Sequence, residues 1–146
     1  MRRFCCVLFV LLSIVGLTPS ASAQQVGSTG KQDTGFHLGQ NYPNPFNPET
    51  KIPFVLSEDL FVDGKAVIVS VRIYNVLLQY ITAPTALSHP SGEGVPVINL
   101  EYPYPGRFEA YWDGRNQSGR QVASGVYFVE LTVNGRGQTR RMYVTK

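Results

Sequence analysis

The turn that follows the only tryptophan holds the residues closest to a chemical motif. Asp113, Asn116 and Gly119 have spacings that faintly resemble a calcium-binding loop. Such a loop needs several carboxylates at alternating positions, often with an acidic residue at its end. Arg115 and Ser118 do not supply that pattern. The segment is instead typical of a hairpin turn in which Asp and Asn bond their own backbone.

Other residues with chemical potential are isolated. His37 and His89 have no His or Cys at ligand spacing, so we expect no metal site. No nucleophile-elbow or comparable hydrolase motif is present, so we expect no catalytic residues, no cofactor and no enzyme. Tyr102, Tyr104 and Tyr111 are candidates for a carbohydrate-binding platform, because aromatic faces suit stacking. The alternative is that their loop packs on the fold.

Alternating side chains predict the strands that position these residues. Phe108, Ala110 and Trp112 share one face of a strand that begins at Arg107. A second strand begins at Gly125. Four residues of these two strands are the predicted core anchors: Trp112, Tyr127, Val129 and Leu131.

The remaining pattern predicts further strands and no helix. Pro53 lacks the N–H that a strand ladder needs, which places its strand at a sheet edge. Tyr102 and Tyr104 occupy a turn and are expected to be exposed. The other predicted strands are 51–56, 66–74, 77–82, 96–102 and 138–145, with loops at 57–65 and 83–95 and a hairpin turn at 134–137. The fold class predicted is all-β: an immunoglobulin-like antiparallel β-sandwich of about seven strands.

A proline-rich strap precedes the first strand. Each proline fixes its own φ and pushes the preceding residue towards extended geometry, so the strap is expected to be stiff. Two aromatic residues, Tyr42 and Phe46, are expected to pin it to the sandwich. The strap consists of Asn41, Tyr42, Pro43, Asn44, Pro45, Phe46, Asn47 and Pro48. It either covers a sheet edge or is also read by a partner.

The first residues predict export. Arg2 and Arg3 precede an apolar run, and small residues end at Ala23, which is the order of a secretory signal peptide. The predicted organisation is therefore a signal peptide at 1–23, a disordered leader at 24–35 and one domain at 36–146. Cys5 and Cys6 lie inside the signal peptide, so the exported domain has no cysteine and no disulfide.

The charge of the exported chain is nearly balanced. Removing two arginines leaves eleven basic residues against ten acidic ones. No basic stripe is present, so we expect no nucleic-acid partner. After signal removal we also expect no stable membrane span, because no other apolar run approaches the length of about 20 residues that a span needs.

Four blocks in order resemble a known family. They are the segment 40–48 (QNYPNPFNP), 73–75 (IYN), 112–114 (WDG) and 123–128 (ASGVYF), followed by a basic C-terminus. The set resembles the type A C-terminal sorting domain of the type IX secretion system, which is similar to the immunoglobulin-like domain of flagellar hook-capping proteins. The resemblance covers about Phe36 to Lys146.

The resemblance implies a β-sandwich that an outer-membrane translocon recognises once the protein has reached the periplasm. The expected location is then the cell surface or the medium. The implied recognition surfaces are the strap and the terminal strand, with Arg140, Arg141, Tyr143 and Lys146 as contact residues. Three features depart from the family: a short leader in place of a passenger, Leu78 where a glycine is common, and a long connection at 83–102.

Three hypotheses of function follow. The leading one is a non-enzymatic sorting or surface-anchoring module whose partners are translocon proteins. The second is a structural or adhesive module that binds a surface protein or a polysaccharide, motivated by the long connection and by the tyrosines around Gly106. An enzyme is the third.

Overall fold

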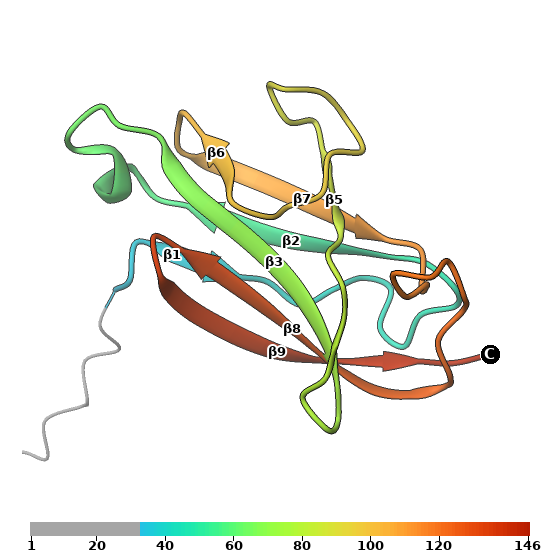
Figure 1. Ribbon diagram of the computed structural model, residues 1–146. Helices are drawn as coiled ribbons and strands as arrows, with labels where there is room; N and C mark the ends of the chain where they lie inside the picture. Colours follow the sequence, from blue (N-terminus) through green and yellow to red (C-terminus); the bar gives the residue numbers. More distant parts are fainter. Residues whose placement is uncertain (1–32) are drawn as a thin grey trace, which may run out of the picture. The chain divides into compact units, whose positions relative to one another are not determined.

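The computed structural model describes residues 33–146, so the predicted signal peptide and most of the predicted leader lie outside the described range. Strands make up nearly all of its regular structure (Figure 1). The elements are β1 (Phe36–Leu38), β2 (Thr50–Leu56), a short 3-10 helix η1 (Glu58–Phe61), β3 (Val67–Asn75), β4 (Tyr80–Thr82), β5 (Thr85–Leu87), β6 (Leu100–Tyr102), β7 (Gly106–Trp112), β8 (Gly125–Val133) and β9 (Arg136–Val144). Within residues 33–146, no helix is long and apolar enough to cross a membrane.

The strands form two sheets. The first has the order β1-β2-β7-β5, and the second has the order β4-β3-β8-β9 with β6 also paired to β3. Every pairing between these strands is antiparallel. The predicted β-sandwich is therefore confirmed. The described part has nine strands rather than about seven, mainly because short strands form at β1 and inside the predicted loop 83–95.

Alternate side chains of both sheets build the core. On β3 the four residues Val67, Val69, Val71 and Ile73 are at most 1% exposed. Removing such apolar surface from water is the main force that holds two sheets together. The four predicted core anchors (Trp112, Tyr127, Val129 and Leu131) are all buried. Aromatic rings of the two sheets contact each other in the core. The ring centroids of Trp112 (β7) and Tyr127 (β8) are 5.7 Å apart, and those of Phe54 (β2) and Tyr102 (β6) are 5.6 Å apart.

Pro53 does not lie on an edge strand, so that prediction is wrong. β2 runs between β1 and β7. Opposite Pro53, however, β1 has already ended, and the Gly39 N–H donates to the Pro53 carbonyl over 2.8 Å. The N–H and C=O of one antiparallel strand residue point to the same side, so the donor that Pro53 lacks would have faced Gly39 and not β7. The β2–β7 ladder is thus left intact.

The hairpin between β3 and β4 differs from its prediction. The returning strand begins at Tyr80 rather than at Leu77, and Leu77 and Leu78 form an exposed tip. Asn75 organises this turn, because its Oδ1 accepts hydrogen bonds from the N–H groups of Leu77 (3.0 Å) and Gln79 (2.9 Å). Leu78 has a φ of 59°, which a leucine rarely adopts and a glycine adopts readily. Leu78 therefore occupies a backbone conformation that favours glycine.

The predicted turn at Asn134 and Gly135 has positive φ at both residues (47° and 81°), as a type I′ hairpin requires. Two other local predictions are wrong. The strand predicted at 96–102 forms only at Leu100–Tyr102. Tyr102, expected to be exposed, is fully buried among aromatic rings.

Candidate functional site

The strap and β9 lie side by side, although they are far apart in the sequence. The Phe46 N–H donates to the Tyr143 carbonyl (2.9 Å), and the Thr145 N–H donates to the Phe46 carbonyl (2.9 Å). The Tyr143 N–H donates to Asn44 Oδ1 at 3.0 Å. These bonds cover part of the outer edge of the second sheet. The two predicted recognition segments thus form one continuous surface, here named the strap–β9 seam (residues 40–48 and 140–146).

Phe46 anchors the strap in the core, next to Trp112 at the end of β7. Its side chain is 1% exposed, and its ring lies 5.3 Å from that of Trp112. Trp112 is held in turn, since its Nε1–H donates to the Arg115 carbonyl over 2.9 Å. Tyr127 packs on the other side of this cluster, and its hydroxyl donates to the Ala123 carbonyl at 3.0 Å. Three large rings therefore pack together at this end of the domain, and the polar atoms of Trp112 and Tyr127 are hydrogen-bonded.

Gly114 allows the strap to approach. A Cβ on Gly114 would lie 2.3 Å from the Pro48 carbonyl oxygen, which is well inside van der Waals contact. Its φ of +73° also favours glycine. The blocks 40–48, 112–114 and 123–128 therefore meet at one place, and Asn75 of the fourth block pairs with Tyr127 there. The four sequence blocks thus lie next to one another at one end of the domain.

Not every predicted contact residue faces solvent. Asn41 is 2% exposed, and its amide donates to the Pro43 carbonyl (3.1 Å) and to Thr50 Oγ1 (3.0 Å). Arg140 is half-buried, and its Nε–H donates to the Leu38 carbonyl at 2.5 Å. Together with Phe46, these residues hold the strap and the sheet edge in place. Their side chains are structural supports of the seam.

Tyr42 attaches the strap to the outer face of the first sheet and not to the core. Its ring is 43% exposed, and its hydroxyl donates to a carboxylate oxygen of Glu109 on the outer face of the first sheet. This hydrogen bond is the main cause of the raised pKa of Tyr42. Phe46 alone supplies the aromatic anchor. The exposed residues of the seam are Gln40, Tyr42, Pro43, Pro45, Asn47, Pro48, Arg141, Tyr143, Thr145 and Lys146.

A shallow cavity opens along the seam. It has a volume of about 460 Å³. Two of its lining residues are arginines and none is acidic, so it favours an anionic or carbonyl-rich partner. The lining residues are Gln40, Asn44, Phe128, Thr139, Arg140, Arg141 and Tyr143. The side-chain amide of Gln40 donates to the Arg141 carbonyl (3.1 Å). At this position a side chain, and not another strand, bonds the outer edge of β9.

An aromatic row continues from the seam across the outer face of the second sheet. Phe128 is the direct cross-strand neighbour of both Arg141 on β9 and Tyr74 on β3. Tyr74 in turn pairs with Tyr80, and their rings are 6.1 Å apart. Sequence reasoning missed this row. The signal was available, because Tyr74 and Phe128 occupy the outward positions of strands whose inward positions are apolar.

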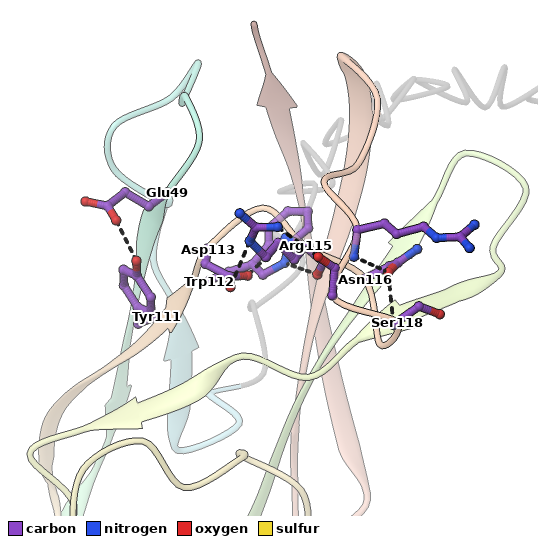
Figure 2. Close-up of polar contacts among 9 residues, drawn as sticks. Glu49, Tyr111, Trp112, Asp113, Arg115, Asn116 and Ser118 are labelled. Atoms are coloured by element: carbon purple, nitrogen blue, oxygen red, sulfur yellow. Dashed lines mark hydrogen bonds and ion pairs between the residues drawn. The ribbon is translucent and has the colours of Figure 1, made fainter.

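Polar atoms in the turn after Trp112 are used internally (Figure 2). Asp113 Oδ1 accepts a hydrogen bond from the Arg115 N–H (3.0 Å). Asn116 Oδ1 accepts from the N–H groups of Ser118 and Arg120, each at 3.0 Å. These are the backbone-bonding turns that the sequence predicts in place of a calcium loop. Among residues 33–146, no three His, Cys, Asp or Glu side chains are grouped to hold a metal ion.

The three tyrosines considered as a carbohydrate platform do not lie together on one surface. Tyr102 is buried and cannot stack on a ligand, whereas Tyr104 is 49% exposed. Tyr104 and Tyr111 lie near opposite ends of β7, which runs from Gly106 to Trp112. Figure 2 shows Tyr111 directed at Glu49, to which its hydroxyl donates at 2.5 Å. This hydrogen bond raises the pKa of Tyr111 to about 12.

Comparison with known proteins bears on the fold. No protein family matches the sequence, and no curated protein matches it. Part of dimeric latent PorU from Porphyromonas gingivalis superimposes with a TM-score of 0.51 and 18% identity, over 75% of this chain and 9% of that chain. PorZ of the same organism, an essential bacterial surface component of the type-IX secretion system, gives a TM-score of 0.41 and 22% identity over 83% of this chain and 13% of its own. This chain therefore corresponds to a small part of either protein, and the likeness to PorU is one of fold.

Proposed function

We propose that residues 36–146 are a non-enzymatic sorting or surface-anchoring module of type IX secretion, recognised by a translocon protein at the strap–β9 seam. The observation that carries this proposal is the joining of the strap to β9 through Phe46, Asn44 and Tyr143. The family resemblance implies both segments as recognition surfaces. Their contact makes them one site that a single partner can bind at once.

The seam has the chemistry of a binding surface. Its floor is rigid because Phe46 is buried against Trp112. Its rim offers Arg141 and Tyr143, and aromatic and arginine side chains are those that contribute most to protein interfaces. Binding to a rigid surface loses little conformational entropy, so a modest contact area suffices for recognition. In this mechanism the chain breaks no bond, and the partner supplies the transport.

The proposed route is export by the signal peptide, recognition in the periplasm and arrival at the cell surface or in the medium. To test it, residues 33–146 are fused behind a signal peptide and a fluorescent reporter in a bacterium with type IX secretion. We expect the reporter outside the cell, and in the periplasm of a strain that lacks the translocon. A second fusion without residues 143–146 removes the bonds of Tyr143 and Thr145 to the strap and should stay inside. Equal periplasmic retention of all fusions would refute the proposal.

A second candidate is an adhesive module that binds a surface protein. The aromatic row of Tyr80, Tyr74 and Phe128 favours it, because these rings lie on a sheet face open to solvent. Replacing Tyr80 by Ala should then weaken attachment of the purified protein to whole cells. Export of the reporter fusion would be unaffected by that change. Full attachment of the variant would remove this candidate.

A further inference from the structure

We infer that the outer face of the first sheet carries a site for a neutral sugar residue of a polysaccharide, between Tyr42 and Tyr111. The site is a cavity of about 140 Å³ on that face. It has room for a single sugar ring. The lining residues are Tyr42, Pro43, Glu49, Thr50, Lys51 and Tyr111, here named the Tyr42–Tyr111 cleft.

Strand register places the two tyrosines on either side of one lysine. Lys51 on β2 is paired with Tyr111 on β7, and its other neighbour is Tyr42 in the strap. Lys51 is exposed, whereas Thr50 and Ile52 on either side of it are buried, so this row faces outward. Two aromatic rings beside a shallow apolar hollow are suited to the C–H faces of a sugar ring.

Both rings are fixed before any ligand arrives. The Tyr111 hydroxyl donates to Glu49 (2.5 Å), and the Tyr42 hydroxyl donates to Glu109. A ring held in this way loses little further freedom on binding. The sequence alone does not indicate that these two rings are neighbours, because Tyr42 lies in the strap and Tyr111 lies on β7.

Polar groups around the rings suit hydroxyls. The Glu49 and Glu109 carboxylates each accept one hydrogen bond from a tyrosine hydroxyl and retain lone pairs for sugar hydroxyls. The Lys51 ammonium is the complementary donor, and none of the ion pairs found in residues 33–146 involves it. An apolar peptide side chain would leave these groups without partners. Among the lining residues Glu49 is the one carboxylate and Lys51 the one cation, so the cleft has no excess positive charge to attract a phosphate or a uronic acid, and the ligand is a neutral sugar.

The test is native affinity electrophoresis of the exported, purified protein in gels that contain a β-1,3-glucan, a β-1,4-glucan, an α-mannan or polygalacturonate. We expect at least one neutral polysaccharide to retard the protein and polygalacturonate not to. Tyr42→Ala and Tyr111→Ala should each weaken the retardation about tenfold, since each removes one stacking surface. Tyr42→Phe keeps its ring and should retain most of the binding.

The matched control is Tyr104→Ala, which removes another exposed tyrosine (49% exposed) away from the cleft. It should leave the retardation unchanged. Tryptophan fluorescence confirms that each variant is folded. The inference is overturned if no neutral polysaccharide retards the protein, if only polygalacturonate does, or if Tyr104→Ala weakens binding as much as the cleft variants. Tyr111 lies outside the strap–β9 seam, so Tyr111→Ala should weaken sugar binding and keep export, which separates this site from the proposed function.

Discussion

The fit of Gly114 against the strap gives the sharpest test of how this domain is built. In Gly114→Ala, the added methyl group would lie 2.3 Å from the Pro48 carbonyl oxygen. The backbone atoms of Pro48 cannot rotate away as a flexible side chain could. The strap must therefore shift. Phe46 lies only two residues before Pro48, so its ring must move away from Trp112.

Gly119→Ala is the matched control. Gly119 has almost the same φ (+75° against +73°), but no atom lies within 4 Å of its added Cβ. A left-handed φ costs a non-glycine residue about 1–2 kcal/mol, so this variant should lose about that much stability. Gly114→Ala carries the same conformational cost plus about 1–3 kcal/mol for forcing extra volume into a packed site. The expected loss is thus about 2–5 kcal/mol.

The assay is equilibrium unfolding in urea, followed through the single tryptophan. Trp112 contacts Phe46 directly, so its emission in the folded state should also shift in Gly114→Ala and not in Gly119→Ala. The difference between the two unfolding free energies isolates the contact with Pro48. If the two variants lose stability equally, within about 0.5 kcal/mol, the strap is not held against Gly114 and the reasoning is refuted.

Three further predictions concern single residues. Leu78→Gly should stabilise the domain by about 1 kcal/mol by relieving its φ of 59°, whereas Leu77→Gly should not; equal urea midpoints would contradict this. Phe46→Ala should cost about 3–5 kcal/mol in the same assay, and a loss under about 1 kcal/mol would show that the strap is dispensable. Burial raises the pKa of Tyr102 to about 12, against about 10 in the unfolded chain. The unfolded state therefore releases this proton first, and Tyr102 should contribute a fall in stability of about 1.4 kcal/mol per pH unit between pH 10 and 12. Tyr102→Phe should remove that contribution and gain about 1–3 kcal/mol at pH 7, because the Tyr102 hydroxyl is the one buried side-chain polar atom without a partner among residues 33–146.

Local periodicity predicted the parts of the fold that have one buried face. β7 and β8 alternate between buried and less buried residues, and β3 does so except at the buried Ser70; each was predicted within about two residues of its observed bounds. Short strands such as β5 were missed, because three residues carry no period and depend on a neighbour far along the chain. The strand of Pro53 was wrongly predicted to be an edge strand for a related reason. A strand can lie inside a sheet while the neighbouring strand ends before it reaches one of its residues.

The candidate site depended even more on long-range contact. The strap and the terminal strand were predicted separately, and no sequence pattern indicated that Asn44 bonds Tyr143, which is 99 residues away. Burial of Tyr102 was equally hidden, because a tyrosine between turn residues looks exposed until the rings that cover it are placed. The turn chemistry of Asp113 and Asn116 was predictable, since those side chains bond residues only a few positions away.

The most direct test of the central claim compares export of two reporter fusions with matched stability. One carries Arg141→Ala and Tyr143→Ala, which strip the exposed rim of the seam but leave the Tyr143 backbone bonds to the strap. The other carries Tyr104→Ala, which removes an exposed ring away from the seam. We predict that the Tyr104 variant is exported normally and that the seam variant accumulates, folded, in the periplasm. Export of both variants at the same level would contradict recognition at the strap–β9 seam.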